Sequence, residues 1–422
     1  INAIWFVFAA VCSYFIAYRF YSKFIERKLT RPDDRRATPA EYNANGKDFM
    51  PTDRRVLYGH HFAAIAGAGP LVGPVLAAQM GYLPGTIWII VGVILAGAVQ
   101  DYLVLFFSMR RGGRSLGQMA REELGVVGGY AAIIATLAIM IIIVAILALG
   151  LSHIMHQWLG GASMMSFWYH FAIMFEALFI LTAVDAGTRV ARFMLTDTLG
   201  NFIPKFRDAD WRAGAWLTTA IMVAGWGSIL ILGVTDPLGG INTFFPLFGI
   251  ANQLLAAIAL AVCLAIAANL HRFKYLWIIL LPLAFDVLVT VTGSWQKIFS
   301  PDPKVGYWAN HFAFKDALAQ GQTSFGTAKN VEAMEAVVRN TFVQGTLSIL
   351  FVVLTIIVVI MAVVEAVKAL RGHERRTHED PYVESRFYAP SGLGATPSEK
   401  ALAKQWDALP IEQRTPTGGG HH

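Results

Sequence analysis

Ionisable side chains inside long apolar segments are the residues of this sequence most able to do chemistry. Glu176 lies near the middle of the apolar segment 167–186, between Phe175 and Ala177. A charged side chain at the centre of a bilayer costs about 2.5 to 3.5 kcal/mol on insertion scales, so such a residue usually serves a function. Because loss of solvation favours the protonated carboxyl group, Glu176 is a candidate proton carrier. The alternative is a structural carboxyl group that bonds a neighbouring helix.

Two adjacent histidines and one aspartate extend the set of candidate proton carriers. His60 and His61 lie where the segment 57–80 begins, and Asp101 lies about two thirds of the way along the next apolar segment. Histidine titrates near neutral pH, and adjacent helical residues point about 100° apart, so one ring can face a pore while the other faces a partner. The alternatives are interfacial anchors for the histidines and a polar cap of the span for Asp101. A zinc site is disfavoured because the two histidines lack i,i+4 spacing.

A stretch rich in glycine and proline predicts an interrupted helix in 57–80. Its candidate substrate-binding positions are Gly67, Gly69, Pro70 and Gly73. Pro70 removes a backbone donor and biases Gly69 away from helical geometry. Glycines expose backbone N–H groups, and the positive end of a half-helix that begins at Pro70 can receive a carboxylate. Close helix packing by small residues is the alternative.

A second, weaker signal of the same kind lies at 245–253. This stretch combines Pro246 and Gly249 with two amide side chains, Asn252 and Gln253, which are further candidates for substrate binding. A second interruption here would place polar groups inside the bilayer, where irregular backbone occurs only if it lines a cavity or is buried in protein. Alternatively, Pro246 is the first residue of an ordinary helix.

The elements that must position these residues are membrane-spanning helices. Of 422 residues, 55% are hydrophobic and 15% are charged, against about 25% charged in an average soluble domain. This composition argues against a soluble enzyme and predicts an all-α, polytopic membrane protein. Since a helix needs about 20 apolar residues to cross the hydrocarbon core, the sequence predicts nine spans: 1–20, 57–80, 85–109, 128–150, 167–186, 213–234, 245–268, 275–294 and 343–367.

Basic residues between the predicted spans orient the chain. Twenty-five Lys and Arg residues lie in the connections on one side, and five lie in 295–342 on the other. The positive-inside rule therefore places residue 1 outside and the C-terminus in the cytoplasm. We expect an N-terminal membrane region at 1–150, a five-helix membrane region at 151–375 and a cytoplasmic tail at 376–422, whose Pro, Gly and charge content predicts disorder. Residues 188–204 are expected to form a short amphipathic helix on the cytoplasmic surface.

Four blocks of sequence resemble the carbon starvation protein A family of bacterial inner-membrane transporters. They are YGHHFAAIAGAGPLVGPVLAAQMGYLPG at 58–85, AGAVQDYLVLFFSMRRGGRSLGQMAREELG at 96–125, FWYHFAIMFEALFILTAVDAGTRVARFMLTDTLGNF at 167–202 and DPLGGINTFFPLFGIANQLLAA at 236–257. The resemblance implies uptake of small nutrients, with peptides and pyruvate as the substrates linked to the family, driven by protons during carbon starvation. It also implies an inverted-repeat core with two discontinuous helices.

From the resemblance and the residues together, we expect a multi-pass secondary transporter of the bacterial inner membrane. Its partners would be a small carboxylate nutrient, protons and the lipid bilayer, with no nucleic acid, cofactor, metal or enzymatic activity. An intramembrane enzyme and a structural or sensory membrane subunit are the alternatives. Family members are longer, with a further membrane block near 149–153, so we expect this junction to join two stretches of a longer protein. An intact mass close to that of 422 residues would contradict this expectation.

Overall fold

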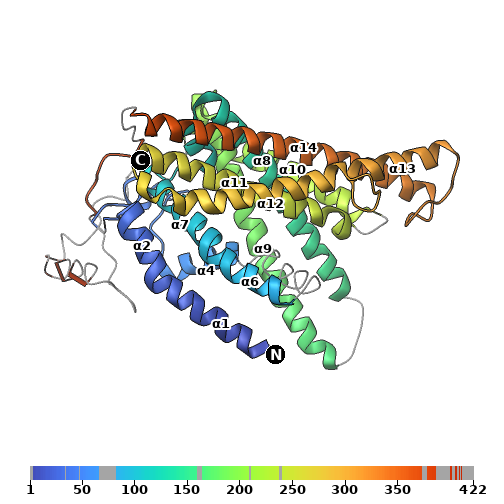
Figure 1. Ribbon diagram of the computed structural model, residues 1–422, viewed down its shortest axis with the longest axis horizontal. Coiled ribbons are helices and arrows are strands. Elements are labelled where there is room, and N and C mark those ends of the chain that lie inside the picture. Colours follow the sequence, from blue (N-terminus) through green and yellow to red (C-terminus); the bar gives the residue numbers. More distant parts are fainter. Residues whose placement is uncertain are drawn as a thin grey trace.

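Helices account for most of the described residues in the computed structural model (Figure 1). The structure describes residues 3–33, 35–46, 48–65, 82–158, 164–208, 211–236, 240–372 and 378–385, with a few positions beyond 400. In these ranges the β-type contacts are two isolated bridges, Arg36 with Glu384 and Phe325 with Ala328. The predicted all-α class is confirmed.

Seven helices in the described ranges are long and apolar enough to span a bilayer. They cover Ile4–Thr30, Leu83–Arg110, Leu116–Ala145, Arg212–Val234, Pro246–Asn269, Trp277–Phe299 and Val331–Leu370, and each overlaps a predicted span. Of the other two predicted spans, 57–80 begins on α4 (Arg54–Ile65) and continues outside the described residues. The span 167–186 falls on α9 (Met164–Leu199), where most side chains up to residue 179 are not described.

The other helices follow the chain in order. The first span contains α1 (Ala3–Ile16) and α2 (Lys23–Ile25), and α3 (Pro39–Tyr42) follows it. The next two spans comprise α6 (Tyr82–Gly92), α7 (Ala98–Arg110) and α8 (Leu116–Trp158). The last five long elements are α10 (Arg212–Val234), α11 (Gly240–Asn269), α12 (Trp277–Phe299), α13 (Tyr307–Ala319) and α14 (Val331–Leu370).

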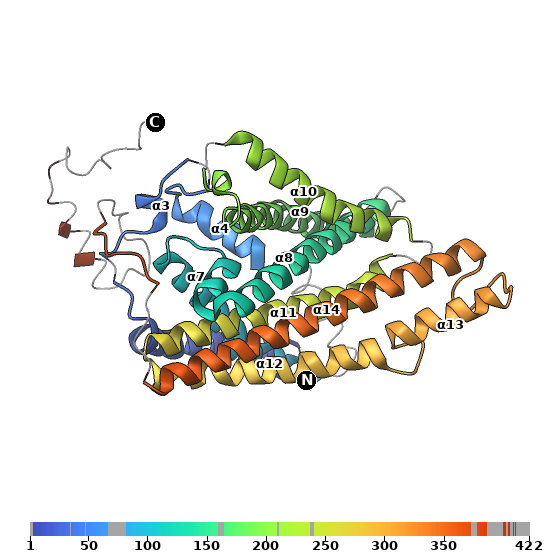
Figure 2. The ribbon, with the colours of Figure 1, turned by 90° about the horizontal axis from the view of Figure 1, so that it is seen from above.

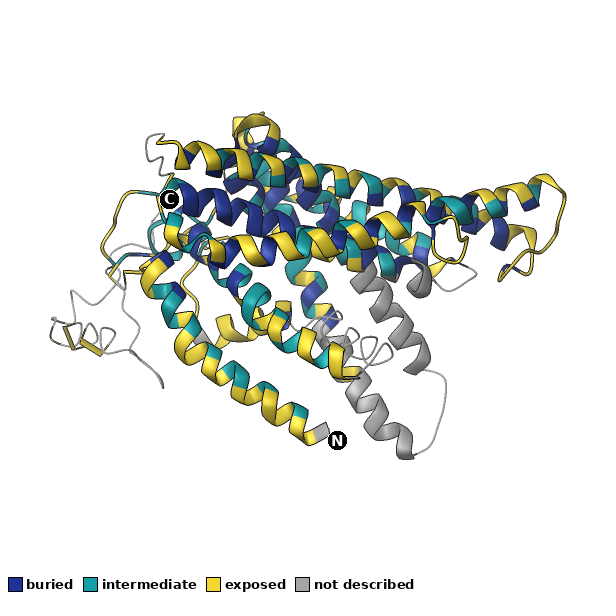
Figure 3. Ribbon diagram, in the orientation of Figure 1, coloured by how far each residue is buried: buried dark blue, intermediate teal, exposed yellow. Residues whose placement is uncertain are grey.

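Helix α11 lies at the centre of the bundle, in contact with α7, α8, α12 and α14 (Figures 1 and 2). From Ala257 to Ala268 every residue is buried. This stretch is apolar on all sides, and a helix of that kind is stable only when other helices surround it. Figure 3 shows the same contrast between the buried α11 and the exposed faces of α1 and α6.

The predicted interruption at 245–253 is wrong, because α11 runs without a break from Gly240 to Asn269 and contains Pro246 as an interior residue. Phe244, Leu247 and Ala251 around the proline are buried in the core. Pro246 lies in the second turn of the helix, where its missing N–H removes a single backbone bond. Packing of the surrounding apolar residues therefore keeps the helix continuous.

The predicted surface helix at 188–204 is also not a separate element. Residues 188–199 form the end of α9, which continues unbroken as far as Leu199, and a short 3-10 turn follows at Pro204–Arg207. No proline lies between 186 and 199 to stop the helix. Helix α9 therefore carries the polar residues of its last turns beyond the apolar part of the span.

Aromatic side chains on the outside of the bundle fit a lipid surface. Trp216 on α10 and Trp295 on α12 are 79% and 65% exposed, and each lies near one end of its helix. Tryptophan at such positions is typical of the two interfaces of a membrane. Exposed apolar residues along α1, such as Phe8 and Phe15, agree with contact to the hydrocarbon core.

Candidate functional site

The span that carries Asp101 is not a uniform α-helix. Between α6 and α7 the residues Val93–Gly97 form a π-helical turn. π-Helical turns are rare and often occur at functional sites, because they shift the side chains that follow. Asp101 lies in the first turn of α7, directly after this irregularity, and is half-buried.

Two of the predicted proton carriers are brought together from separate segments. His61 on α4 lies close enough to Asp101 on α7 for an electrostatic interaction between the two side chains. His60 and His61 are both exposed in the described part of the structure. Of the two histidines, the structure therefore links His61 to a carboxylate inside a membrane span.

Helix α4 also packs against α9, the helix that carries Glu176. The side chain of Glu176 lies outside the described residues, as do Gly67, Gly69, Pro70 and Gly73. Asn252 and Gln253 are described and lie exposed on α11, between the buried Ala251 and Leu254. Both amides therefore lie outside the buried core of α11.

Asp286 is an intramembrane carboxylate to which the sequence assigned no role. It lies in the middle of α12, and its Oδ1 accepts a hydrogen bond from Thr290 Oγ1 at 3.2 Å. Its Oδ2 is buried and has no hydrogen-bond partner in the described part of the chain. A buried, half-satisfied carboxylate is costly, so its position inside an apolar span was the signal that could have singled it out.

A buried ion pair closes the basic end of the bundle. Arg111 Nη2 lies 2.7 Å from Glu123 Oε1, and the two side chains are 1% and 0% exposed. Asn269 at the end of α11 donates to Glu123 Oε2 at 2.7 Å, and His378 Nδ1 lies 3.4 Å from Oε1. The charge of Arg111 is buried, and its pair with Glu123 joins α7, α8 and α11.

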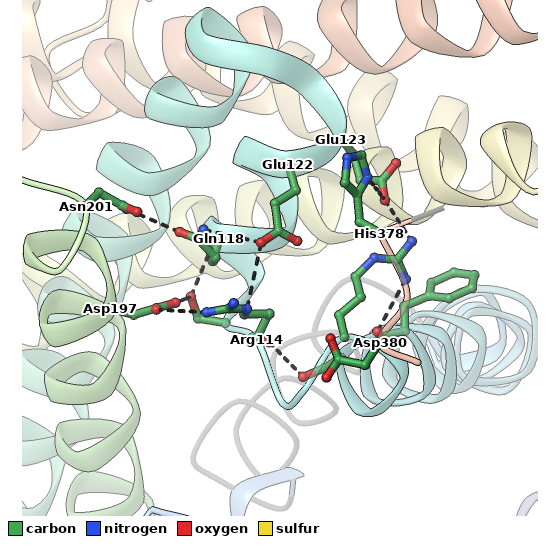
Figure 4. A network of polar contacts seen from close by, with 12 residues as sticks. Arg114, Gln118, Glu122, Glu123, Asp197, Asn201, His378 and Asp380 are labelled. Atoms are coloured by element: carbon green, nitrogen blue, oxygen red, sulfur yellow. Dashed lines mark hydrogen bonds and ion pairs between the residues drawn. The ribbon is translucent and has the colours of Figure 1, made fainter. Parts of the chain in front are cut away.

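A second set of polar contacts ties the start of α8 to the end of α9 (Figure 4). Arg114 forms ion pairs with Glu122 and Asp197, both at 3.7 Å. Gln118 accepts a hydrogen bond from Asn201 at 3.2 Å and donates to Glu122 at 3.3 Å. Together with the buried pair and its partners, these contacts link α7, α8, α9, α11 and His378 at the basic end.

Residues 378–385 also pack at this end, although they belong to the range 376–422 for which composition predicts disorder. Asp380 N donates to Arg110 O at 2.9 Å, and Ser385 N donates to Arg35 O at 2.7 Å. The Tyr42 hydroxyl donates to Asp380 Oδ2 at 2.9 Å. Burial, followed by the bond to the Asp380 carboxylate, raises the pKa of Tyr42 to about 12, so the phenol remains a donor at neutral pH.

These features define the class of protein. A bundle of apolar helices holds carboxylates inside its spans, places a histidine beside one of them and closes one end with a polar network. Among the described residues, no group of three or more His, Cys, Asp or Glu side chains is arranged to hold a metal ion. This combination is typical of a polytopic transporter that moves ions or small polar solutes.

The chain belongs to the carbon starvation protein CstA family. The family model for carbon starvation protein CstA matches residues 2–149 and 144–293. A protein of Mycobacterium tuberculosis named peptide transporter CstA is 34% identical, in an alignment covering 97% of this chain and 90% of that protein. The alignment extends over 682 residues, more than the 422 of this chain, so the relative contains residues with no counterpart here.

Two proteins of Escherichia coli K12 show the same similarity over most of their length. The peptide transporter CstA is 29% identical over 90% of this chain and 93% of its own length. The pyruvate/proton symporter BtsT is 27% identical over 91% of this chain and 94% of its own length. All three relatives are named as transporters. No solved structure matches the chain.

Proposed function

We propose that this protein is a secondary transporter that imports a small carboxylate nutrient, a short peptide or pyruvate, together with protons across the bacterial inner membrane. The observation that carries the proposal is the electrostatic interaction between His61 on α4 and Asp101 on α7, two titratable side chains from separate helices. The names of the relatives, peptide transporter and pyruvate/proton symporter, support the choice of substrates.

The pair suggests how a proton changes the conformation. An ionised Asp101 attracts a protonated His61, whereas a protonated Asp101 is neutral and loses this attraction. Proton binding therefore weakens the electrostatic interaction between these two side chains, which favours movement of α4. Glu176 and His60 are further candidates for the proton path, and the substrate carboxylate is proposed to bind at Gly67, Gly69, Pro70 and Gly73, with Asn252 and Gln253 as additional contacts.

Uptake into vesicles tests the proposed function. The purified protein is reconstituted into vesicles, and an inward proton gradient is imposed. Under this gradient we expect labelled pyruvate or L-alanyl-L-alanine to accumulate above its outside concentration. A proton ionophore should abolish the accumulation, because the gradient is its source of free energy. Vesicles without protein are the control. Accumulation of neither substrate, with intact folded protein, would contradict the proposal.

We further propose that the basic end of the bundle is cytoplasmic. Basic residues are concentrated at this end, whereas α13 and the start of α14 lie at the other (Figure 2). In a variant with Cys12→Ser and Cys263→Ala, we expect Lys315→Cys to react with an impermeant maleimide added to intact cells. Lys47→Cys should react only after the membrane is opened. Labelling of both positions from outside would contradict this orientation.

A further inference from the structure

A cavity lies at the outer end of the bundle, far from the basic end. It has a volume of about 380 Å³ and is formed by the ends of α11, α12 and α14 with the start of α13. Small-molecule sites typically measure ~300–1,000 Å³, so it can hold a ligand the size of a short peptide. Its polar lining includes Asp236, Lys297, Tyr307, Asn340, Thr341 and Gln344.

One part of the lining presents hydrogen-bond acceptors. Asp236 is buried, and its Oδ2 accepts a hydrogen bond from Asn340 Nδ2 at 3.0 Å. The Oδ1 atom of Asn340 is buried without a partner among the described residues, and Asn340 is only 2% exposed. A carboxylate beside an unsatisfied carbonyl oxygen is suited to an ammonium group, which has three N–H donors and no acceptor.

Another part of the lining presents donors. The ammonium of Lys297 lies 5.3 Å from the ring centroid of Tyr307, and within the described ranges Lys297 forms no ion pair with a carboxylate. The hydroxyl of Tyr307 is buried and also lacks a partner there, and the residue is 4% exposed. Burial raises the pKa of the Tyr307 phenol, which therefore stays protonated as a donor. A lysine beside an unsatisfied hydroxyl is suited to a carboxylate.

We propose that this cavity is an outer binding site for a small zwitterion, in which Asp236 and Asn340 bind the α-ammonium and Lys297 and Tyr307 bind the carboxylate. The inference rests on the proposed transport function and specifies its substrate as a short peptide. Pyruvate carries a carboxylate but no ammonium, so it would engage the donors and leave the buried carbonyl oxygen of Asn340 without a donor. The site therefore favours zwitterions over simple carboxylates.

A set of four ligands separates the two halves of the site. Binding of L-alanyl-L-alanine, its N-acetyl derivative, its C-terminal amide and pyruvate would be measured by calorimetry on the whole protein in lipid nanodiscs. We expect the unmodified dipeptide to bind at least about tenfold more tightly than either derivative or pyruvate, because charge-assisted hydrogen bonds are the strong ones in such a site.

Variants then assign each half. Lys297→Gln should weaken dipeptide binding by about tenfold or more while leaving the amide nearly unchanged, since the amide has no carboxylate to lose. Asp236→Asn keeps an acceptor for Asn340 and should weaken the dipeptide but not the N-acetyl derivative. Tyr307→Phe removes one hydroxyl and should weaken the dipeptide several-fold. Lys315→Gln, an exposed lysine of α13 outside the cavity, should change nothing.

Two outcomes would overturn this assignment. One is dipeptide affinity that is unchanged in folded Lys297→Gln and Asp236→Asn proteins, and the other is an equal loss for all four ligands. If vesicles still accumulate pyruvate or the dipeptide in either case, the proposed function stands and only the outer site is wrong. Failure of the wild-type protein to accumulate both substrates would instead contradict the proposed function. Thermal unfolding of every variant shows that the comparison is made on folded protein.

Discussion

Replacement of Asp101 by asparagine is expected to abolish proton-driven accumulation, reducing the final substrate ratio across the vesicle membrane to about one. Asparagine keeps the size of the side chain and an acceptor oxygen, but it cannot take up or release a proton. The variant therefore resembles a permanently protonated Asp101 without its attraction for His61. Exchange of labelled for unlabelled substrate should continue at a measurable rate, because exchange needs no net proton movement.

The matched control is Asp185→Asn on α9. Asp185 forms an i,i+4 ion pair with Arg189, and its side chain is 55% exposed, so its removal should leave accumulation unchanged. If Asp101→Asn still concentrates substrate with the pH dependence of the wild type, Asp101 is not the coupling residue. Glu176→Gln, measured in the same vesicles, would then test the remaining carboxylate singled out by the sequence.

The buried pair Arg111–Glu123 is expected to have the largest effect on stability. Removing one partner of a buried ion pair typically costs about 3–5 kcal/mol, because the other charge stays buried without compensation. Glu123→Leu should have this effect, since Arg111 is 1% exposed and Asn269 also loses its acceptor. Arg111→Met should be similarly destabilising, because it leaves the Glu123 carboxylate buried without its cation.

A double-mutant cycle separates the pair from the general damage to packing. We expect the variant with both Arg111→Met and Glu123→Leu to be more stable than the sum of the single losses predicts, because no buried charge is left unpaired. The same cycle on the exposed pair Asp185–Arg189 should give a coupling of at most about 1 kcal/mol. Denaturant unfolding in detergent micelles provides the measurement. Additive losses at Arg111 and Glu123 would show that the pair is not a coupled unit.

The spans and the protein class could be predicted from the sequence because they depend on local composition. A run of about 20 apolar residues must cross the bilayer whatever surrounds it, and the seven spanning helices of the described residues agree with that rule. The same local reasoning failed at Pro246. A proline predicts a break only when nothing compensates for the lost hydrogen bond, and here the buried Phe244, Leu247 and Ala251 hold α11 together.

The contacts between helices could not be read from the chain, because they join residues far apart in sequence. His61 and Asp101 were each predicted as titratable candidates, but only the folded structure brings them close enough to interact electrostatically. Arg111 and Glu123 lie 12 positions apart in a charged stretch of the sequence, and only the folded structure joins them as a buried ion pair. Hydropathy records how deep a residue lies in the membrane. It does not record which helix faces it, since that choice depends on the complementary shapes and charges of surfaces that meet only in the folded bundle.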